Sequence, residues 1–125
     1  MTLYIPAVQE DEPDIRELIA ISDVPQTKLG YPTILAKKED EVVGVISTNP
    51  DEEFIMVEPL IAPNGFIFMR LIEHMETALK KVGCSSGLFR VPKVREKMYN
   101  IASKRPDIFT LVAENDAICI YRRDF

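Results

Sequence analysis

Residues 54–83, FIMVEPLIAPNGFIFMRLIEHMETALKKVG, hold the clearest strand-to-helix transition in this chain of 125 residues. The apolar run 54–61 predicts a strand, and Pro59 within it indicates a bulge or bend because proline cannot donate to the ladder. After Asn64 and Gly65 the apolar side chains recur at the spacing of one helix face, which predicts a helix that ends at Gly83. The residues of that face are Phe68, Leu71, Ile72, Met75, Leu79 and Val82. This strand, loop and helix form the centre of the expected fold.

Upstream of this unit the sequence predicts three more strands and a short helix. Residues 3–8 have the pattern of an edge strand, since Pro6 interrupts them. An acidic, proline-containing start predicts an amphipathic helix over residues 13–23. The apolar runs 33–37 and 42–47 flank a polar turn and therefore predict a hairpin.

Downstream, the pattern predicts a strand, a helix and a closing hairpin. The strand covers residues 86–91, and the helix over residues 94–102 ends before Pro106. The hairpin pairs residues 108–113 with 117–122. The expected order is therefore β-α-β-β-β-α-β-α-β-β, an α+β fold with a mixed sheet flanked by three helices.

The composition excludes several classes of protein. The chain is 46% hydrophobic and 28% charged, as is usual for a globular domain, and no linker or repeat divides it, so a single domain over residues 1–125 is expected. No apolar run approaches the roughly 18 residues of a membrane span, and no secretory signal is visible, so a cytoplasmic location is expected. Two cysteines and one histidine provide neither a disulfide framework nor zinc-binding spacing, and no metal is expected.

Charge is unevenly distributed along the chain. The formal net charge is −5, which disfavours nucleic-acid binding. Residues 1–62 carry 4 Lys and Arg against 13 Asp and Glu, a net of −9, whereas residues 63–125 carry 11 against 7, a net of +4. Six basic residues of the second half, listed here, either attract a phosphate ligand or form a solvated helix face: Arg90, Lys93, Arg95, Lys97, Lys104 and Arg105.

The order and spacing of these elements resemble the GNAT family of acyl-coenzyme A (CoA) N-acyltransferases over almost the whole chain. Three segments carry the likeness: residues 38–46 (KEDEVVGVI), residues 56–62 followed by the helix over 66–82, and residues 99–109 followed by the last hairpin. The resemblance implies a sheet in which two parallel strands separate and the pantetheine arm of acetyl-CoA or CoA pairs with the central strand. It also implies that the cofactor's pyrophosphate lies at the N-terminus of the following helix.

The loop before that helix departs from the family pattern. With Leu71 aligned on the family's leucine, Phe66 and Phe68 stand where two glycines are usual. These rings are expected to crowd or fill the pyrophosphate pocket, so that CoA binds differently or not at all. The cofactor-binding residues that the resemblance implies are Leu60, Ile61, Asn64, Gly65, Phe66 and Arg70.

The resemblance also implies candidate catalytic residues. Glu58 lies on the central strand, where an acidic residue often serves as base, and its alternative interpretation is a solvated strand carboxylate. The family's acid is commonly a tyrosine, and its position falls on Ser103 or Lys104, whereas Tyr99 lies a turn earlier. His74 lies off the apolar face of its helix and is expected at the surface.

Two functions from different classes remain open. The first is an atypical acetyl-CoA-dependent N-acetyltransferase whose partner is a small-molecule or protein amine. The second is a catalytically silent GNAT-fold module with a binding or structural role, as among virus-encoded proteins of this fold, whose partner is another protein or a second copy. The altered loop and the missing tyrosine favour the second, and the strand before the loop and the basic C-terminal half favour the first. Neither a nucleic acid nor a membrane is expected as partner.

Overall fold

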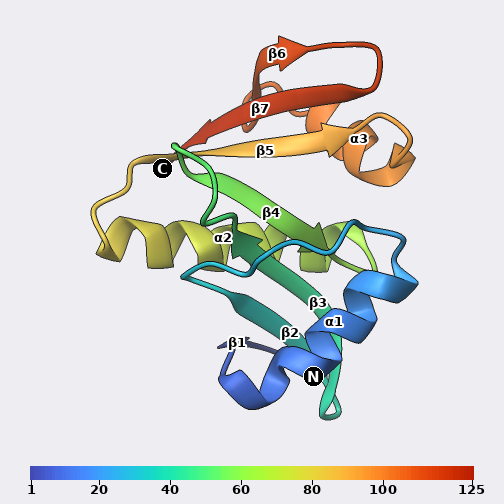
Figure 1. Cartoon of the computed structure of the whole chain (residues 1–125). Coiled ribbons are helices and arrows are strands. Elements are labelled where there is room, and N and C mark those ends of the chain that lie inside the picture. Colours follow the sequence, from blue (N-terminus) through green and yellow to red (C-terminus); the bar gives the residue numbers. More distant parts are fainter.

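Seven strands and three helices account for most of the chain in the computed structural model, which describes residues 1–125 (Figure 1). The strands are β1 (Thr2–Pro6), β2 (Ile34–Lys38), β3 (Glu41–Thr48), β4 (Met56–Ile61), β5 (Ser86–Pro92), β6 (Thr110–Glu114) and β7 (Ile118–Asp124). The helices are α1 (Glu12–Ile21), α2 (Gly65–Lys81) and α3 (Glu96–Ser103), with a short 3-10 helix over Gln9–Asp11 before α1. The predicted order and the α+β class are confirmed.

All seven strands join one sheet in the order β1-β2-β3-β4-β5-β7-β6. Every neighbouring pair is antiparallel except β4 and β5, which α2 connects in parallel. The first strand lies at an edge of the sheet, as Pro6 predicts. Between the pairs Ile46–Leu60 and Thr48–Val57, β4 uses one residue more than β3, which confirms the bulge expected near Pro59.

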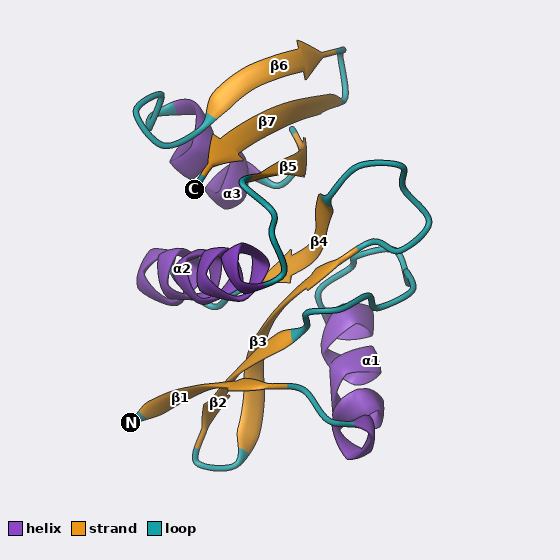
Figure 2. Ribbon diagram, turned by 90° about the vertical axis from the view of Figure 1, so that its left-hand side faces the viewer, coloured by secondary structure: helices purple, strands orange, loops and turns teal.

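Two apolar clusters fix the helices on opposite faces of the sheet. Figure 2 shows α1 and α2 on either side of β2 and β3. The larger cluster has 17 buried residues and joins α2 and α3 to the sheet, while a cluster of five buried residues lies beneath α1. The close approach of α2 depends on Gly44, where a Cβ atom would lie 2.9 Å from the carbonyl oxygen of Ile61 and 3.2 Å from Cδ1 of Leu71. The absence of a side chain at Gly44 therefore lets Leu71 of α2 pack closely on β3.

The strands β4 and β5 diverge soon after they meet (Figure 1). They pair only at Met56–Leu88 and Val57–Phe89. Beyond these pairs the edge of β4 that faces β5 has no strand partner, although its other edge pairs with β3 as far as Ile61. The sheet is therefore splayed at its centre.

Candidate functional site

A cleft with a volume of about 1060 Å³ opens where β4 and β5 separate. Its walls come from the end of β4, the loop and first turn of α2, the helix α3 and the end of α1. The lining residues are 22, 23, 60–65, 68, 94–98, 100 and 101. The volume is just above the range of about 300–1,000 Å³ that ligand pockets occupy.

Backbone donors face this cleft at the start of α2. Asn64 caps the helix, since its Oδ1 accepts a hydrogen bond from the amide of Ile67 at 2.9 Å. The amides of Gly65 and Phe66 have no hydrogen-bond partner in the chain, and the first turn of α2 carries no acidic residue. Such unpaired amides at a helix N-terminus favour an anion.

The two phenylalanines at the start of α2 differ in their relation to the cleft. Phe66 is 73% exposed and is absent from the cleft lining. Phe68 is 6% exposed, belongs to the main apolar cluster and forms part of the cleft wall. Phe66 is therefore not placed to fill the cleft, whereas the crowding expected from Phe68 stays a prediction.

The other residues predicted from the resemblance fall into two groups. Leu60, Ile61, Asn64 and Gly65 all line the cleft. Arg70 lies outside it: its Nη1 is 2.9 Å from Oε2 of Glu73, and its guanidinium lies 5.5 Å from the centre of the Tyr4 ring.

Ser103 is also remote from the cleft lining. It is exposed at the last position of α3, one residue before the C-cap. Tyr99, one turn earlier, is half-buried and packs against the main apolar cluster rather than lining the cleft. Neither hydroxyl is therefore among the groups that face the cleft.

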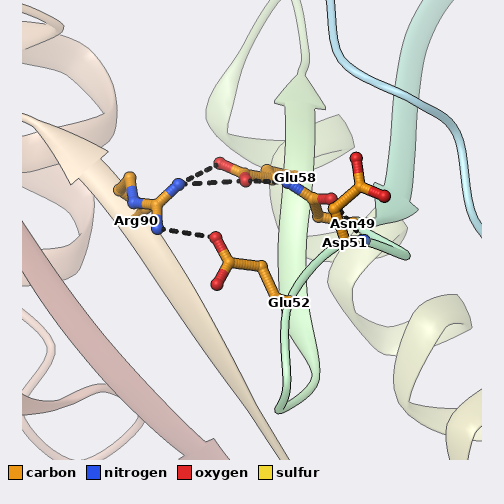
Figure 3. Close-up of polar contacts among 5 residues, drawn as sticks. All are labelled: Asn49, Asp51, Glu52, Glu58 and Arg90. Atoms are coloured by element: carbon orange, nitrogen blue, oxygen red, sulfur yellow. Dashed lines mark hydrogen bonds and ion pairs between the residues drawn. The ribbon is translucent and has the colours of Figure 1, made fainter.

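Glu58 takes part in an ion-pair network where β4 and β5 begin to diverge (Figure 3). Arg90 of β5 donates from Nη1 to both carboxylate oxygens of Glu58, at 3.0 and 3.2 Å, and from Nη2 to Glu52 at 3.0 Å. Asn49 donates from Nδ2 to Oε1 of Glu58 at 2.7 Å. The side chain of Glu58 is only 17% exposed, so the alternative of a solvated carboxylate is wrong. The pair follows directly after Val57 and Phe89, the last paired residues of the two strands.

Sequence reasoning missed the contribution of α1, whose end reaches the cleft through Ser22 and Asp23. Of the six basic residues singled out above, only Arg95 and Lys97 line the cleft. The others have carboxylate partners or lie elsewhere: Lys93, for example, pairs with Glu114 at 2.8 Å. The charge pattern indicated a basic region but could not tell which cations are free.

The lone histidine lies away from this cleft, and it is less exposed than the sequence predicts. His74 is half-buried, with its ring stacked on that of Tyr4 at a centroid distance of 5.0 Å. Burial, and then the nearby charge of Arg70, lower the pKa of His74. The expectation of a surface histidine is wrong, because β1 covers this side of α2.

Two further properties complete the description of the site. No three His, Cys, Asp or Glu side chains come together as a group that could hold a metal ion. None of the helices has the length and apolar content needed to cross a membrane.

Comparison with solved structures identifies the fold. No family model and no curated protein match the sequence. Among solved structures, the PaiA N-acetyltransferase of Thermoplasma acidophilum in complex with coenzyme A is 11% identical, with a TM-score of 0.73 over 100% of this chain and 99% of that chain. A GNAT-family acetyltransferase from Staphylococcus aureus Mu50 is 12% identical, with a TM-score of 0.76 over 99% of both chains. The ribosomal-protein-alanine N-acetyltransferase of Brucella melitensis is 13% identical, with a TM-score of 0.73 over 98% of this chain and 99% of that chain. The chain therefore has the fold of the GNAT N-acetyltransferases.

Proposed function

We propose that this protein binds acetyl-CoA in the cleft between β4 and β5 and transfers the acetyl group to an amine. One observation carries the proposal: the sheet splays after two strand pairs, and an open cleft lies there beside an unpaired β4 edge. A solved structure of the same fold, the PaiA N-acetyltransferase, is a complex with coenzyme A.

The residues present fit such a cofactor. The unpaired edge of β4 at Leu60 and Ile61 offers backbone groups to an amide-containing arm. The amides of Gly65 and Phe66 offer donors to phosphate oxygens, and Phe66 leaves them accessible because its ring is exposed.

Bound acetyl-CoA would supply a thioester carbonyl to the acceptor amine. The chain's part is then to accept the amine proton. Glu58 is the proposed base; it lies on β4 two residues before Leu60, where the cleft lining begins. Its Oε1 already accepts from Asn49 and Arg90, whereas its Oε2 accepts only from Arg90 at 3.2 Å. A carboxylate oxygen has two acceptor sites, so Oε2 keeps one for a proton. A role for Ser103 as acid stays a prediction from the resemblance, since its hydroxyl lies outside the cleft lining.

The test is thiol release from acetyl-CoA across a panel of amines by the wild type, Glu58→Gln and Glu53→Gln. Glu53 is an exposed carboxylate of the β3–β4 loop that makes no ion pair, so it serves as a matched control. We expect turnover that Glu58→Gln lowers by about 10²-fold or more and that Glu53→Gln leaves intact. Equal loss in both variants, with folding unchanged, contradicts the assignment of Glu58.

The second candidate is a catalytically silent module of the same fold. It is favoured by the engagement of Glu58 with Arg90 and by the absence of a hydroxyl in the cleft from Ser103 or Tyr99. Binding of CoA without thiol release on any amine supports this candidate, and turnover excludes it.

A further inference from the structure

Arg95 is the one arginine of this protein without a carboxylate partner. Each of the other six lies within 4.0 Å of an Asp or Glu oxygen: Arg16, Arg70, Arg90, Arg105, Arg122 and Arg123. Arg95 instead donates from Nη2 to the backbone carbonyl of Ser22 at 2.6 Å. A guanidinium has five N–H donors, so most of its donor capacity is unused.

This hydrogen bond joins two walls of the cleft. Ser22 is the C-cap of α1 and Arg95 is the N-cap of α3, and both residues line the cleft. The two positions are 73 residues apart, and no other hydrogen bond joins these two helix ends. Arg95 satisfies a carbonyl at the C-terminal end of α1, where the last turn carries no basic residue of its own.

The surroundings of Arg95 contain charges of both signs. Lys97 lines the same cleft without a carboxylate partner, and Asp23 and Glu96 line it without a cationic one. These four charges cancel, so the cleft is not a general anion trap. Arg95 and the N-terminus of α2, with its unpaired amides, line the same cleft, so an anion in it has both kinds of donor available.

We propose that Arg95 is a phosphate ligand for the CoA diphosphate and that it binds this group with N–H donors that its bond to Ser22 leaves unused. The inference rests on the proposed function and deepens it. In this chain the cation comes from α3, across the cleft, and Arg70 cannot supply it because it is engaged with Glu73 and Tyr4.

The experiment is an NMR titration of the full chain with CoA and, separately, with pantetheine, which has the same arm but no phosphate. The variants are Arg95→Gln, Arg95→Lys and, as control, Arg105→Gln, whose arginine lies just after α3, is exposed and pairs with Asp107. We expect Arg95→Gln to weaken CoA binding about tenfold or more, because a charge-assisted bond is lost. Pantetheine binding should not change, and Arg95→Lys should recover part of the CoA affinity.

The amide resonances of Ser22 and Asp23 report on Arg95, because Arg95 donates to the carbonyl of Ser22. In the wild type they should shift with CoA but not with pantetheine, and in Arg95→Gln they should already be shifted without ligand. Equal weakening of CoA and pantetheine by Arg95→Gln would show that Arg95 only holds the two helix ends together, and the proposal would fail. Wild-type binding of pantetheine but not of CoA also overturns it, while binding of neither overturns the proposed function itself.

Discussion

The two sides of the cleft are built differently. On the N-terminal side, five of the six residues of β4 are buried, and α1 and α2 cover opposite faces of the sheet (Figure 2). On the C-terminal side, β5 has buried residues only at alternate positions and every residue of β6 is exposed. A strand buried on both faces has near-continuous burial, whereas one covered on a single face alternates. The cleft therefore lies between a fully covered part of the sheet and a part covered on one face only.

The sheet can splay without coming apart because side chains cross the boundary between its two sides. Only two strand pairs join β4 to β5, but Arg90 bridges the same boundary through Glu58 and Glu52. The main apolar cluster also crosses it, since Phe89 and Leu71 both belong to it. Side chains thus hold the two sides together where the backbone ladder stops.

The largest expected effect is a loss of stability in a variant that tests the unequal burial on the two sides of the cleft. Leu71 is fully buried between α2 and β3, so Leu71→Ala should lower the free energy of unfolding by about 2–5 kcal/mol. Leu111 on β6 is 48% exposed, and Leu111→Ala should change it by no more than about 0.5 kcal/mol. Urea unfolding measures both, and equal losses would contradict the comparison.

The next effect concerns the bridge at the boundary. Arg90→Met removes the counter-ion of two partly buried carboxylates, those of Glu58 and Glu52, and should lower the free energy of unfolding by about 1–2 kcal/mol. Arg122 is nearly half exposed and pairs only with Asp124, so Arg122→Met is the control and should have a smaller effect. A loss in Arg90→Met no larger than in the control would mean that the network does not hold the strands together.

A smaller effect, on the affinity for CoA, is expected at Asp23, just after the end of α1. Asp23 lines the cleft and has a positive φ of 55°, a conformation that asparagine also adopts. Asp23→Asn removes a negative charge near the proposed phosphate site and should tighten CoA binding by about two- to fivefold. Isothermal titration calorimetry measures this, with Asp51→Asn, on the exposed β3–β4 loop, as control. Unchanged or weaker binding in Asp23→Asn would place the phosphates elsewhere.

The smallest expected effect is a dependence of the free energy of unfolding on pH, caused by His74 of α2. Burial lowers the pKa of His74 below its ordinary value of 6.5, so the folded protein favours the neutral ring. As the pH falls below 6.5, the unfolded chain takes up a proton first, and the free energy of unfolding should fall until the pH reaches the lower pKa of the folded state. His74→Phe keeps a ring against Tyr4 and should reduce this decline in urea unfolding measured on both sides of pH 6.5. An unchanged decline would assign it to other groups.

Local patterns predicted the fold because each element carries its own signal. The apolar face of α2, the edge position of Pro6 and the bulge near Pro59 all follow from periodicity or from the missing N–H of proline. The candidate site depends on where individual side chains point and what they contact, and periodicity does not give this. Sequence alone could not tell that Phe66 faces solvent, or that Glu58 meets Arg90 on the neighbouring strand.

The contacts of Arg95 could not be predicted from local sequence patterns either. It stood among six basic residues that the sequence could not separate, and only tertiary contacts distinguish the one arginine without a carboxylate partner. His74 was misplaced for a related reason, since the strand that covers it is 70 residues away in the sequence.

The central claim is that CoA binds at the start of α2, and thermal unfolding of the wild type and Gly65→Asp with CoA tests it most directly. Gly65 has only Cδ1 of Ile101 within 4 Å of an added Cβ, at 3.8 Å, and a carboxylate at a helix N-terminus is stabilising, so this variant should fold. The same carboxylate would repel a phosphate. At a CoA concentration of about 100 times Kd, the wild type should gain about 2.7 kcal/mol and several degrees in Tm, and Gly65→Asp should gain little. No shift in the wild type, or an equal shift in both proteins, would contradict the account.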